Sequence, residues 1–190
     1  SVSLNEGDWR KQVEGTVKAL ADPEFAWVMK ERGPIAIAAG KFSDNPKTLV
    51  PFTVIKNRED AIAFGEALKE AGATFDDGPS TNIDRALLHA AAQIKGTPCP
   101  ESWNRVVDIS TDGQATSAPS AKEASNALYT LGIRVNGLAV GAQASLDSLK
   151  QHVITENGFA EKTDWDNYGI ALRDKIVRET SALEKPTRTR

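Results

Sequence analysis

The chain has very few of the residues that build disulfides, thiolate metal clusters or membrane spans. Its one cysteine among 190 residues, Cys99, lies between two prolines, so neither an intrachain disulfide nor a cysteine metal cluster can form. No apolar run approaches the ~20 residues of a membrane-spanning helix. The formal net charge is −3 and lysine and arginine form no stripe, which argues against nucleic-acid binding.

The common catalytic signatures are absent as well. The sequence contains no Gly-x-x-x-x-Gly-Lys-Ser/Thr phosphate loop, no Gly-x-Gly-x-x-Gly after a strand, no Gly-x-Ser-x-Gly elbow and no His-Glu-x-x-His pair. His89 and His152 lie on predicted helices without a companion ligand. A catalytic pair of residues from separate loops stays open, because such pairs need not be close in sequence.

The start of the chain is abrupt. The only methionine is Met29, so we expect that Ser1 is not a translation start and that a preceding segment was either cleaved in the cell or cut away by design. A cleaved secretion signal is one candidate, and we therefore expect an exported protein.

What remains is the composition of an ordinary globular domain, with 40% hydrophobic and 26% charged residues. We expect one domain over residues 1–183, followed by a flexible tail at 184–190. Helical spacing and β-type apolar runs alternate along the chain. The predicted helices include 9–20, 58–71, 83–94, one that opens on a Ser120–Glu123 capping box, 145–153 and a last one with Leu172, Ile176 and Leu183; the predicted strands are 35–39, 49–55, 105–111, 134–140 and 159–161.

This alternation predicts an α/β fold with a doubly wound, mostly parallel sheet and helices on both faces. The pair at 35–39 and 49–55 is the exception, because about ten residues are too few for a helical crossover. We expect this pair to form an antiparallel hairpin.

Oxygen-bearing residues gather where these elements end. Asp112 follows the buried strand at 105–111, Thr81 precedes the helix at 83–94, and Ser1 and Ser3 precede the first helix. Ligands of open α/β sheets bind beyond the carboxyl ends of the strands, so these loops should converge at one rim. Hydroxyl and carboxylate oxygens suit Mg²⁺, Mn²⁺ or Ca²⁺ rather than zinc or copper.

Each of these residues also has a simpler interpretation. Asp112 could be simply a turn-forming residue before Gly113, and Thr81 could be simply a helix cap. Ser1 and Ser3 could be a frayed end. The loop acids Asp76 and Asp77 are interpreted as solvated. Asp108 lies ~13 Å along the strand from Asp112, too far to share an ion. We expect it to have a structural role, with a buried partner such as a backbone amide or an arginine.

Thr111-Asp112-Gly113 after a buried strand, together with Pro79-Ser80-Thr81-Asn82-Ile83, resembles the von Willebrand factor A domain. The resemblance covers nearly the whole chain and extends to a bacterial group of uncharacterised, exported proteins of this type. In that family a metal-ion-dependent adhesion site (MIDAS) combines an Asp-x-Ser-x-Ser motif with a threonine and an aspartate from two further loops. The resemblance implies that Ser1 is the last serine of the first motif, Thr81 the threonine and Asp112 the aspartate, with Ser3 a weaker candidate.

The chain departs from the family at its start, because the first aspartate, the first serine and the whole first strand have no counterpart. In this fold that strand lies in the middle of the sheet, beside the strand at 105–111. Its absence would leave unpaired backbone groups on both sides. We therefore expect that the natural protein continues upstream, or that a partner chain or a rearranged pairing fills the gap, and that this chain alone binds metal weakly at best.

The function that the resemblance implies is binding to a protein partner, in which the metal (Mg²⁺, or Mn²⁺ or Ca²⁺) bridges to an aspartate or glutamate of that partner. Two alternatives remain: a scaffold with a vestigial metal site, and a metal-dependent hydrolase of Rossmann-like architecture with Asp112 as general base or metal ligand.

Overall fold

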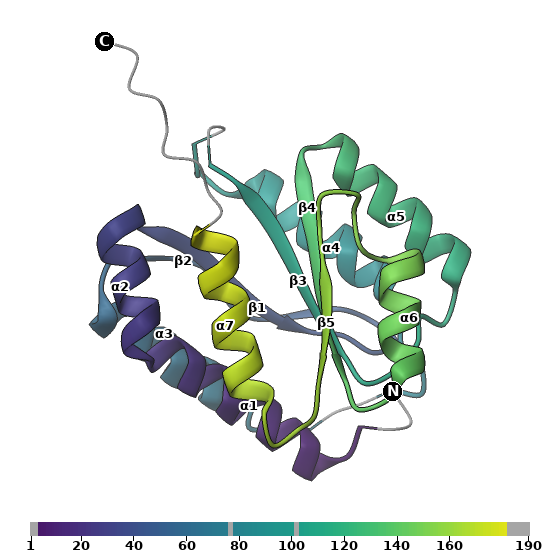
Figure 1. Cartoon of the computed structure of the whole chain (residues 1–190), viewed down its shortest axis with the longest axis horizontal. Coiled ribbons are helices and arrows are strands. Elements are labelled where there is room, and N and C mark those ends of the chain that lie inside the picture. The colour runs from purple at the N-terminus through teal and green to yellow at the C-terminus, as the bar shows by residue number, and fades with distance from the viewer. Residues whose placement is uncertain (1–3, 76–77, 101–102, 182–190) are drawn as a thin grey trace.

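The computed structural model describes residues 4–75, 78–100 and 103–181, which contain seven α-helices and five β-strands (Figure 1). The tail expected at 184–190 lies outside the described residues, as do Leu183, Asp76 and Asp77. The strands are β1 (Ile35–Lys41), β2 (Lys47–Ile55), β3 (Arg105–Thr111), β4 (Ile133–Val140) and β5 (Ala160–Thr163). The helices are α1 (Glu6–Ala21), α2 (Pro23–Arg32), α3 (Arg58–Ala71), α4 (Ile83–Gly96), α5 (Ala118–Thr130), α6 (Gln143–His152) and α7 (Tyr168–Ser181).

The helix starts follow the usual capping chemistry, with one correction to the sequence analysis. The side chains of Asn5 and Asn57 accept hydrogen bonds from the first turns of α1 and α3. The predicted capping box at Ser120–Glu123 is wrong, because Ser117 caps α5 and its Oγ accepts from the Ser120 N–H at 3.4 Å. Pro119 explains the shift: proline lacks an N–H and fits the first turn of a helix, so α5 begins before it.

The strands form the predicted combination of parallel and antiparallel pairs. The order β3-β4-β5 is parallel throughout, and β1 and β2 pair as an antiparallel hairpin. Strand β4, at the centre of the parallel sheet, is buried at every position except Arg134. Burial on both faces is typical of a parallel strand covered by helices on either side, and the predicted fold class is therefore confirmed.

The hairpin and the parallel sheet are hydrogen-bonded separately. Within the described part of the chain, β1 pairs only with β2 and β3 pairs only with β4. Apolar residues of β1 that would be covered inside a continuous sheet, such as Ile35, Ile37 and Ala39, are only half-buried. The described strands therefore form two separately hydrogen-bonded sheets and not one continuous sheet.

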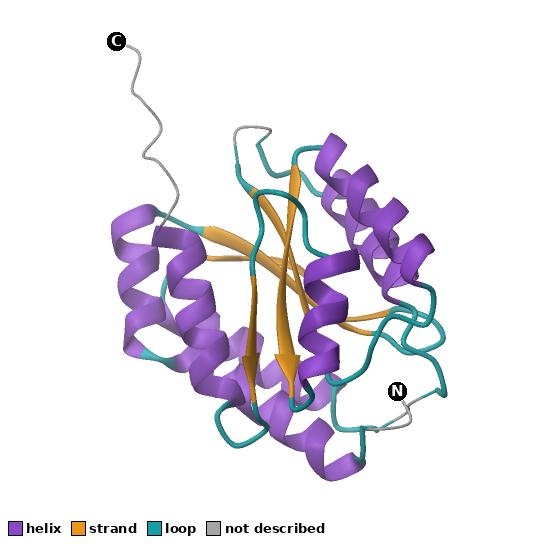
Figure 2. Ribbon diagram, turned by 45° about the vertical axis from the view of Figure 1, so that its right-hand side comes forward, coloured by secondary structure: helices purple, strands orange, loops and turns teal. Residues whose placement is uncertain are grey.

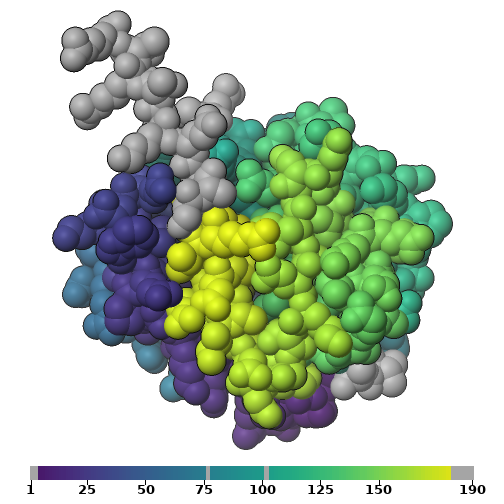
Figure 3. All heavy atoms as spheres, in the orientation of Figure 1, coloured from purple at the N-terminus to yellow at the C-terminus, as the bar shows by residue number. Residues whose placement is uncertain are grey.

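Helices cover both faces of the parallel strands (Figures 1 and 2). The main core lies between β3 and β4 and the helices α4, α5 and α6, and it contains Leu87, Leu128, Val135 and Leu149. On the opposite face, Leu138 and Val140 of β4 pack against α1 and α7. Figure 3 shows the yellow α7 wedged between the dark purple N-terminal helices and the light green β5 region.

Asp108 of β3 faces α7 and not the rim of the sheet. Its carboxylate contacts the ammonium of Lys175, which also lies 2.6 Å from Glu179 Oε1. As expected, Asp108 has a buried partner, although it is of a different type from the backbone amide or arginine given as examples. It is a lysine, and the Asp108 side chain is 33% exposed while that of Lys175 is 1% exposed.

Candidate metal site at the end of strand β3

Thr81 lies two residues before the start of α4 and is 8% exposed. Both of its backbone polar groups are held by one residue: its N–H donates to Thr116 Oγ1 at 2.8 Å, and its C=O accepts from the Thr116 N–H at 3.0 Å. The simpler interpretation of Thr81 as a helix cap is wrong, because the N-cap position of α4 is Asn82. Among the described residues none hydrogen-bonds the Thr81 hydroxyl, which leaves that oxygen available to a ligand.

Asp112 is the first residue after β3 and is half-buried. Its backbone C=O accepts a hydrogen bond from Ser145 Oγ at 2.6 Å, in the first turn of α6. The local turn is closed by Thr111, whose Oγ1 accepts from the Gly113 N–H at 3.1 Å. A threonine hydroxyl and a serine hydroxyl thus both help to fix this loop.

The structure brings the Thr81 and Asp112 loops together. Thr116, which holds Thr81 by two hydrogen bonds, lies four residues after Asp112 in the same β3–α5 loop. Convergence of these two loops at the carboxyl end of β3 was expected, because loops beyond the carboxyl ends of the strands share one rim. The ligand roles of Thr81 and Asp112 stay predictions. Ser1 and Ser3 lie outside the described residues.

The chemistry of this pair of loops fits a hard cation. A hydroxyl and a carboxylate supply oxygen only, as Mg²⁺, Mn²⁺ and Ca²⁺ prefer. A search of the described residues found no group of three or more His, Cys, Asp and Glu side chains that could hold a metal. Any site here would therefore depend on hydroxyl groups and carry little protein charge, which leaves the ion electrophilic toward a further anionic ligand.

Sequence analysis missed a third contributor, the turn between β1 and β2. Its composition, Ser43-Asp44-Asn45-Pro46, is typical of a turn and carries no sign of a role at the rim. In the structure the Ser43 C=O accepts from the Asn82 N–H at 3.1 Å, so this turn packs against the Thr81 loop. The two segments are almost forty residues apart in the sequence, and no local pattern links them. Only the topology of the fold, which brings the hairpin turn to this rim, could have indicated the contact.

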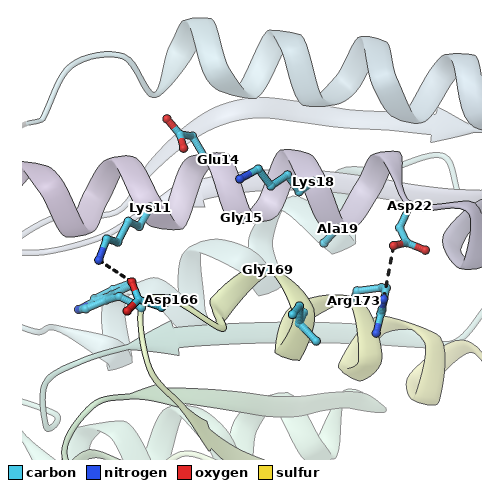
Figure 4. A pocket seen from close by; sticks show the side chains of 11 residues that line it. Lys11, Glu14, Gly15, Lys18, Ala19, Asp22, Asp166, Gly169 and Arg173 are labelled. Carbon is cyan, nitrogen blue, oxygen red and sulfur yellow. Dashed lines mark hydrogen bonds and ion pairs between the residues drawn. The ribbon is translucent and has the colours of Figure 1, made fainter.

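A surface hollow of about 420 Å³ lies elsewhere, between α1 and α7 (Figure 4). Ion pairs flank it, one between Lys11 and Asp166 at 2.7 Å and one between Arg173 and Asp22 at 3.5 Å. Neither Thr81 nor Asp112 lines it. We therefore do not connect this hollow with the candidate metal site.

Comparison with solved structures confirms the fold. The proximal thread matrix protein 1 from the mussel byssus, in a structure described as having a zinc-occupied MIDAS motif, aligns with a TM-score of 0.69 and 20% identity, over 93% of this chain and 43% of that one. Manganese-loaded TRAP protein from Plasmodium vivax aligns with a TM-score of 0.64 and 18% identity, over 93% and 69%. A von Willebrand factor type A structure from Catenulispora acidiphila aligns with a TM-score of 0.66 and 13% identity, over 93% and 39%.

These similarities establish the von Willebrand factor A fold and nothing finer, because the identities are low. The chain spans less than half the length of the mussel protein structure that it matches. No curated protein sequence matches the chain. Among the described residues, no helix is both long and apolar enough to cross a membrane. A family profile matches residues 1–184, and the chain therefore belongs to the family described as "Protein of unknown function (DUF1194)".

Proposed function

We propose that this chain is a protein-binding module whose metal ion, held at the Thr81–Asp112 rim, bridges to an aspartate or glutamate of the partner. The observation that carries the proposal is the hydrogen-bonded junction of the two loops through Thr116, next to a Thr81 hydroxyl without a bond to any described residue. Ser1 would complete the ligand set, with Ser3 as the weaker candidate. The ion proposed is Mg²⁺, with Mn²⁺ or Ca²⁺ as alternatives.

The described fold supports this proposal through two solved structures. The mussel byssus structure is described as having a zinc-occupied MIDAS motif and the Plasmodium structure as manganese-loaded, so divalent ions do bind to proteins of this fold. The proposed activity is binding and not turnover. An exported location is part of the proposal, and fractionation of the producing cells would test it.

The test is metal titration of the full-length protein by calorimetry, with Mn²⁺ and Mg²⁺ as probes. We expect binding that is lost in Asp112→Ala and in Thr81→Ala. Matched controls are Asp166→Ala, an exposed acid in the α1–α7 hollow, and Thr130→Ala at the end of α5. These controls should bind the metal as the wild type does. If the wild type binds neither ion, or if Asp112→Ala binds both unchanged, the proposal fails.

The partner's chemistry needs a separate measurement. We expect Mn²⁺-dependent binding to a subset of peptides in an array that includes each Glu or Asp peptide beside its Gln or Asn counterpart. If the Gln or Asn peptides bind as well as their Glu or Asp counterparts, the metal does not bridge to an acidic side chain of the partner. Turnover of a phosphoester that vanishes in Thr81→Ala and Asp112→Ala would favour the hydrolase alternative instead.

A further inference from the structure

The turn at the tip of the β1–β2 hairpin holds the residues on both sides of Thr81. Asp44 Oδ1 accepts a hydrogen bond from the Ser80 N–H at 3.1 Å. The backbone C=O of Asp44 accepts from the Asn82 side chain, Nδ2, at 3.0 Å. The residue before Thr81 and the residue after it are thus both bound to Asp44.

A second observation shows how closely the carboxylate lies against this loop. A Cβ atom built on Gly78 would lie 2.5 Å from Asp44 Oδ2 and 2.6 Å from Asp44 Cγ. Real Cβ contacts do not come this close, so the Asp44 carboxyl group occupies the space that any side chain at position 78 would need. Glycine at this position lets the carboxylate reach the backbone of the loop.

Further contacts anchor the turn itself. Arg85 Nη1, on the first turns of α4, donates to the Asp44 C=O and to Asn45 Oδ1, both at 3.1 Å. Thr116 holds the backbone of Thr81 from the other side. The Thr81 peptide therefore lies between two clamps, one from the hairpin turn and one from the β3–α5 loop.

We infer that Asp44 is a positioning residue of the metal site, which fixes the Ser80–Asn82 backbone so that the Thr81 hydroxyl points to the ion. The inference rests on the proposed function. The role assigned to Asp44 is to orient the loop through its Oδ1, which accepts from the Ser80 N–H, and not to ligate the ion. Groups that orient a metal ligand typically contribute 10–100-fold to metal affinity.

The role needs an acceptor oxygen and not a negative charge, and this distinction makes it testable. In Asp44→Asn the amide oxygen can still accept from the Ser80 N–H, whereas Asp44→Ala has no acceptor. In the full-length protein we expect Asp44→Ala to weaken Mn²⁺ binding ~10–100-fold. Asp44→Asn should stay within about threefold of the wild type, because the orienting bond survives. Asp166→Ala, which removes an exposed acid of the α1–α7 hollow, serves as the matched control.

Two further measurements test the positioning role in other ways, one by a substitution outside Asp44 and one without metal. Gly78→Ala keeps the aspartate at position 44 but should push its carboxylate away from the loop, and it should therefore weaken Mn²⁺ binding. Without metal, amide exchange of a peptide covering 78–83 should be faster in Asp44→Ala than in the wild type and near the wild-type rate in Asp44→Asn.

The outcomes separate this inference from the proposed function. A wild type that binds no Mn²⁺ overturns the proposed function. A wild type that binds Mn²⁺, with Asp44→Ala binding equally well, overturns only the positioning role. If Asp44→Asn binds as poorly as Asp44→Ala, the charge or direct ligation of Asp44 matters, and the positioning role is again wrong.

Discussion

Lys175 and Glu179 contact each other one helical turn apart on α7, with 2.6 Å between Nζ and Oε1 and side-chain exposures of 1% and 7%. The carboxylate of Asp108, on β3, contacts the same ammonium. Asn136, on β4, donates from Nδ2 to Glu179 Oε1 at 2.8 Å. This buried polar cluster ties α7 to two strands of the parallel sheet.

Burial, and then the negative charge of Asp108, raise the pKa of Glu179 to about 8. The folded protein therefore keeps a proton on Glu179 at neutral pH, while in the unfolded chain this carboxyl ionises near ~4.3. Between these two values the folded state binds the extra proton, so this group makes the protein less stable as the pH rises. Burial of Lys175 lowers its pKa, but the negative charge of Asp108, joined by that of Glu179 once it ionises at higher pH, outweighs this and raises the pKa. The ammonium therefore does not titrate in this window.

Glu179→Gln should remove this pH dependence, because glutamine mimics the neutral carboxyl and keeps an acceptor for Asn136. We expect the variant to melt near the wild-type temperature at about pH 5 and at least ~3 °C above it at about pH 8.5, where ~1 kcal/mol shifts Tm by roughly that amount. Thermal unfolding at both pH values is the measurement. A difference between variant and wild type that does not change with pH would contradict the assignment.

The crossing of α1 and α7 depends on two glycines in contact (Figure 4). A Cβ on Gly15 would lie 2.8 Å from Tyr168 Cδ1 and 3.1 Å from the Gly169 backbone nitrogen. Alanine favours a helix over glycine by ~1 kcal/mol, but backbone atoms on a packed neighbour cannot move aside cheaply. We therefore expect Gly15→Ala to lower the free energy of unfolding by ~1–3 kcal/mol in urea titration.

Gly96 is the control for that substitution. It ends α4, and a Cβ built on it meets nothing within 4 Å. Gly96→Ala should leave the free energy of unfolding unchanged or raise it slightly. If Gly15→Ala behaves like Gly96→Ala, the two helices do not need the close approach.

Hydrogen exchange should distinguish the strands by how many edges are paired. Strand β4 pairs with β3 and β5, whereas within the described residues β1 and β3 each have one paired edge. We expect amides of 133–140 to exchange most slowly and those of 35–41 faster, because local opening of a strand paired on one side costs less. Equal protection of both segments by mass spectrometry would mean that something else pairs with β1.

Local sequence patterns predicted the helices and strands well. They could not predict contacts between residues that lie far apart in the sequence. Helical spacing and the apolar runs located β3, β4 and α4 to within about two residues, because each periodicity is a local property. The capping position of α5 was misplaced by three residues, because two serines compete for it and Pro119 decides between them.

The site shows the same division. The motif around Thr81 and Asp112 predicted a shared rim, since parallel strands end at one edge. The clamp by Asp44 was not predictable, because its partner Ser80 lies 36 residues away. Likewise, the Lys175 partner of Asp108 is 67 residues distant, and no periodicity encodes such a contact.

Ser145 supports the Asp112 loop from α6, and its loss should affect both stability and metal binding. The residue is 2% exposed, and its Oγ donates to the Asp112 C=O at 2.6 Å. Ser145→Ala should cost ~0.5–1.5 kcal/mol of unfolding free energy, the value of a typical hydrogen bond, and should weaken Mn²⁺ binding by the full-length protein.

Ser125→Ala is the matched control, because this serine is 1% exposed and its Oγ has no hydrogen-bond partner among the described residues. The control should be neutral or stabilising and should bind Mn²⁺ as the wild type does. Ser145→Ala with unchanged Mn²⁺ affinity would show that the metal site tolerates a loosened Asp112 loop.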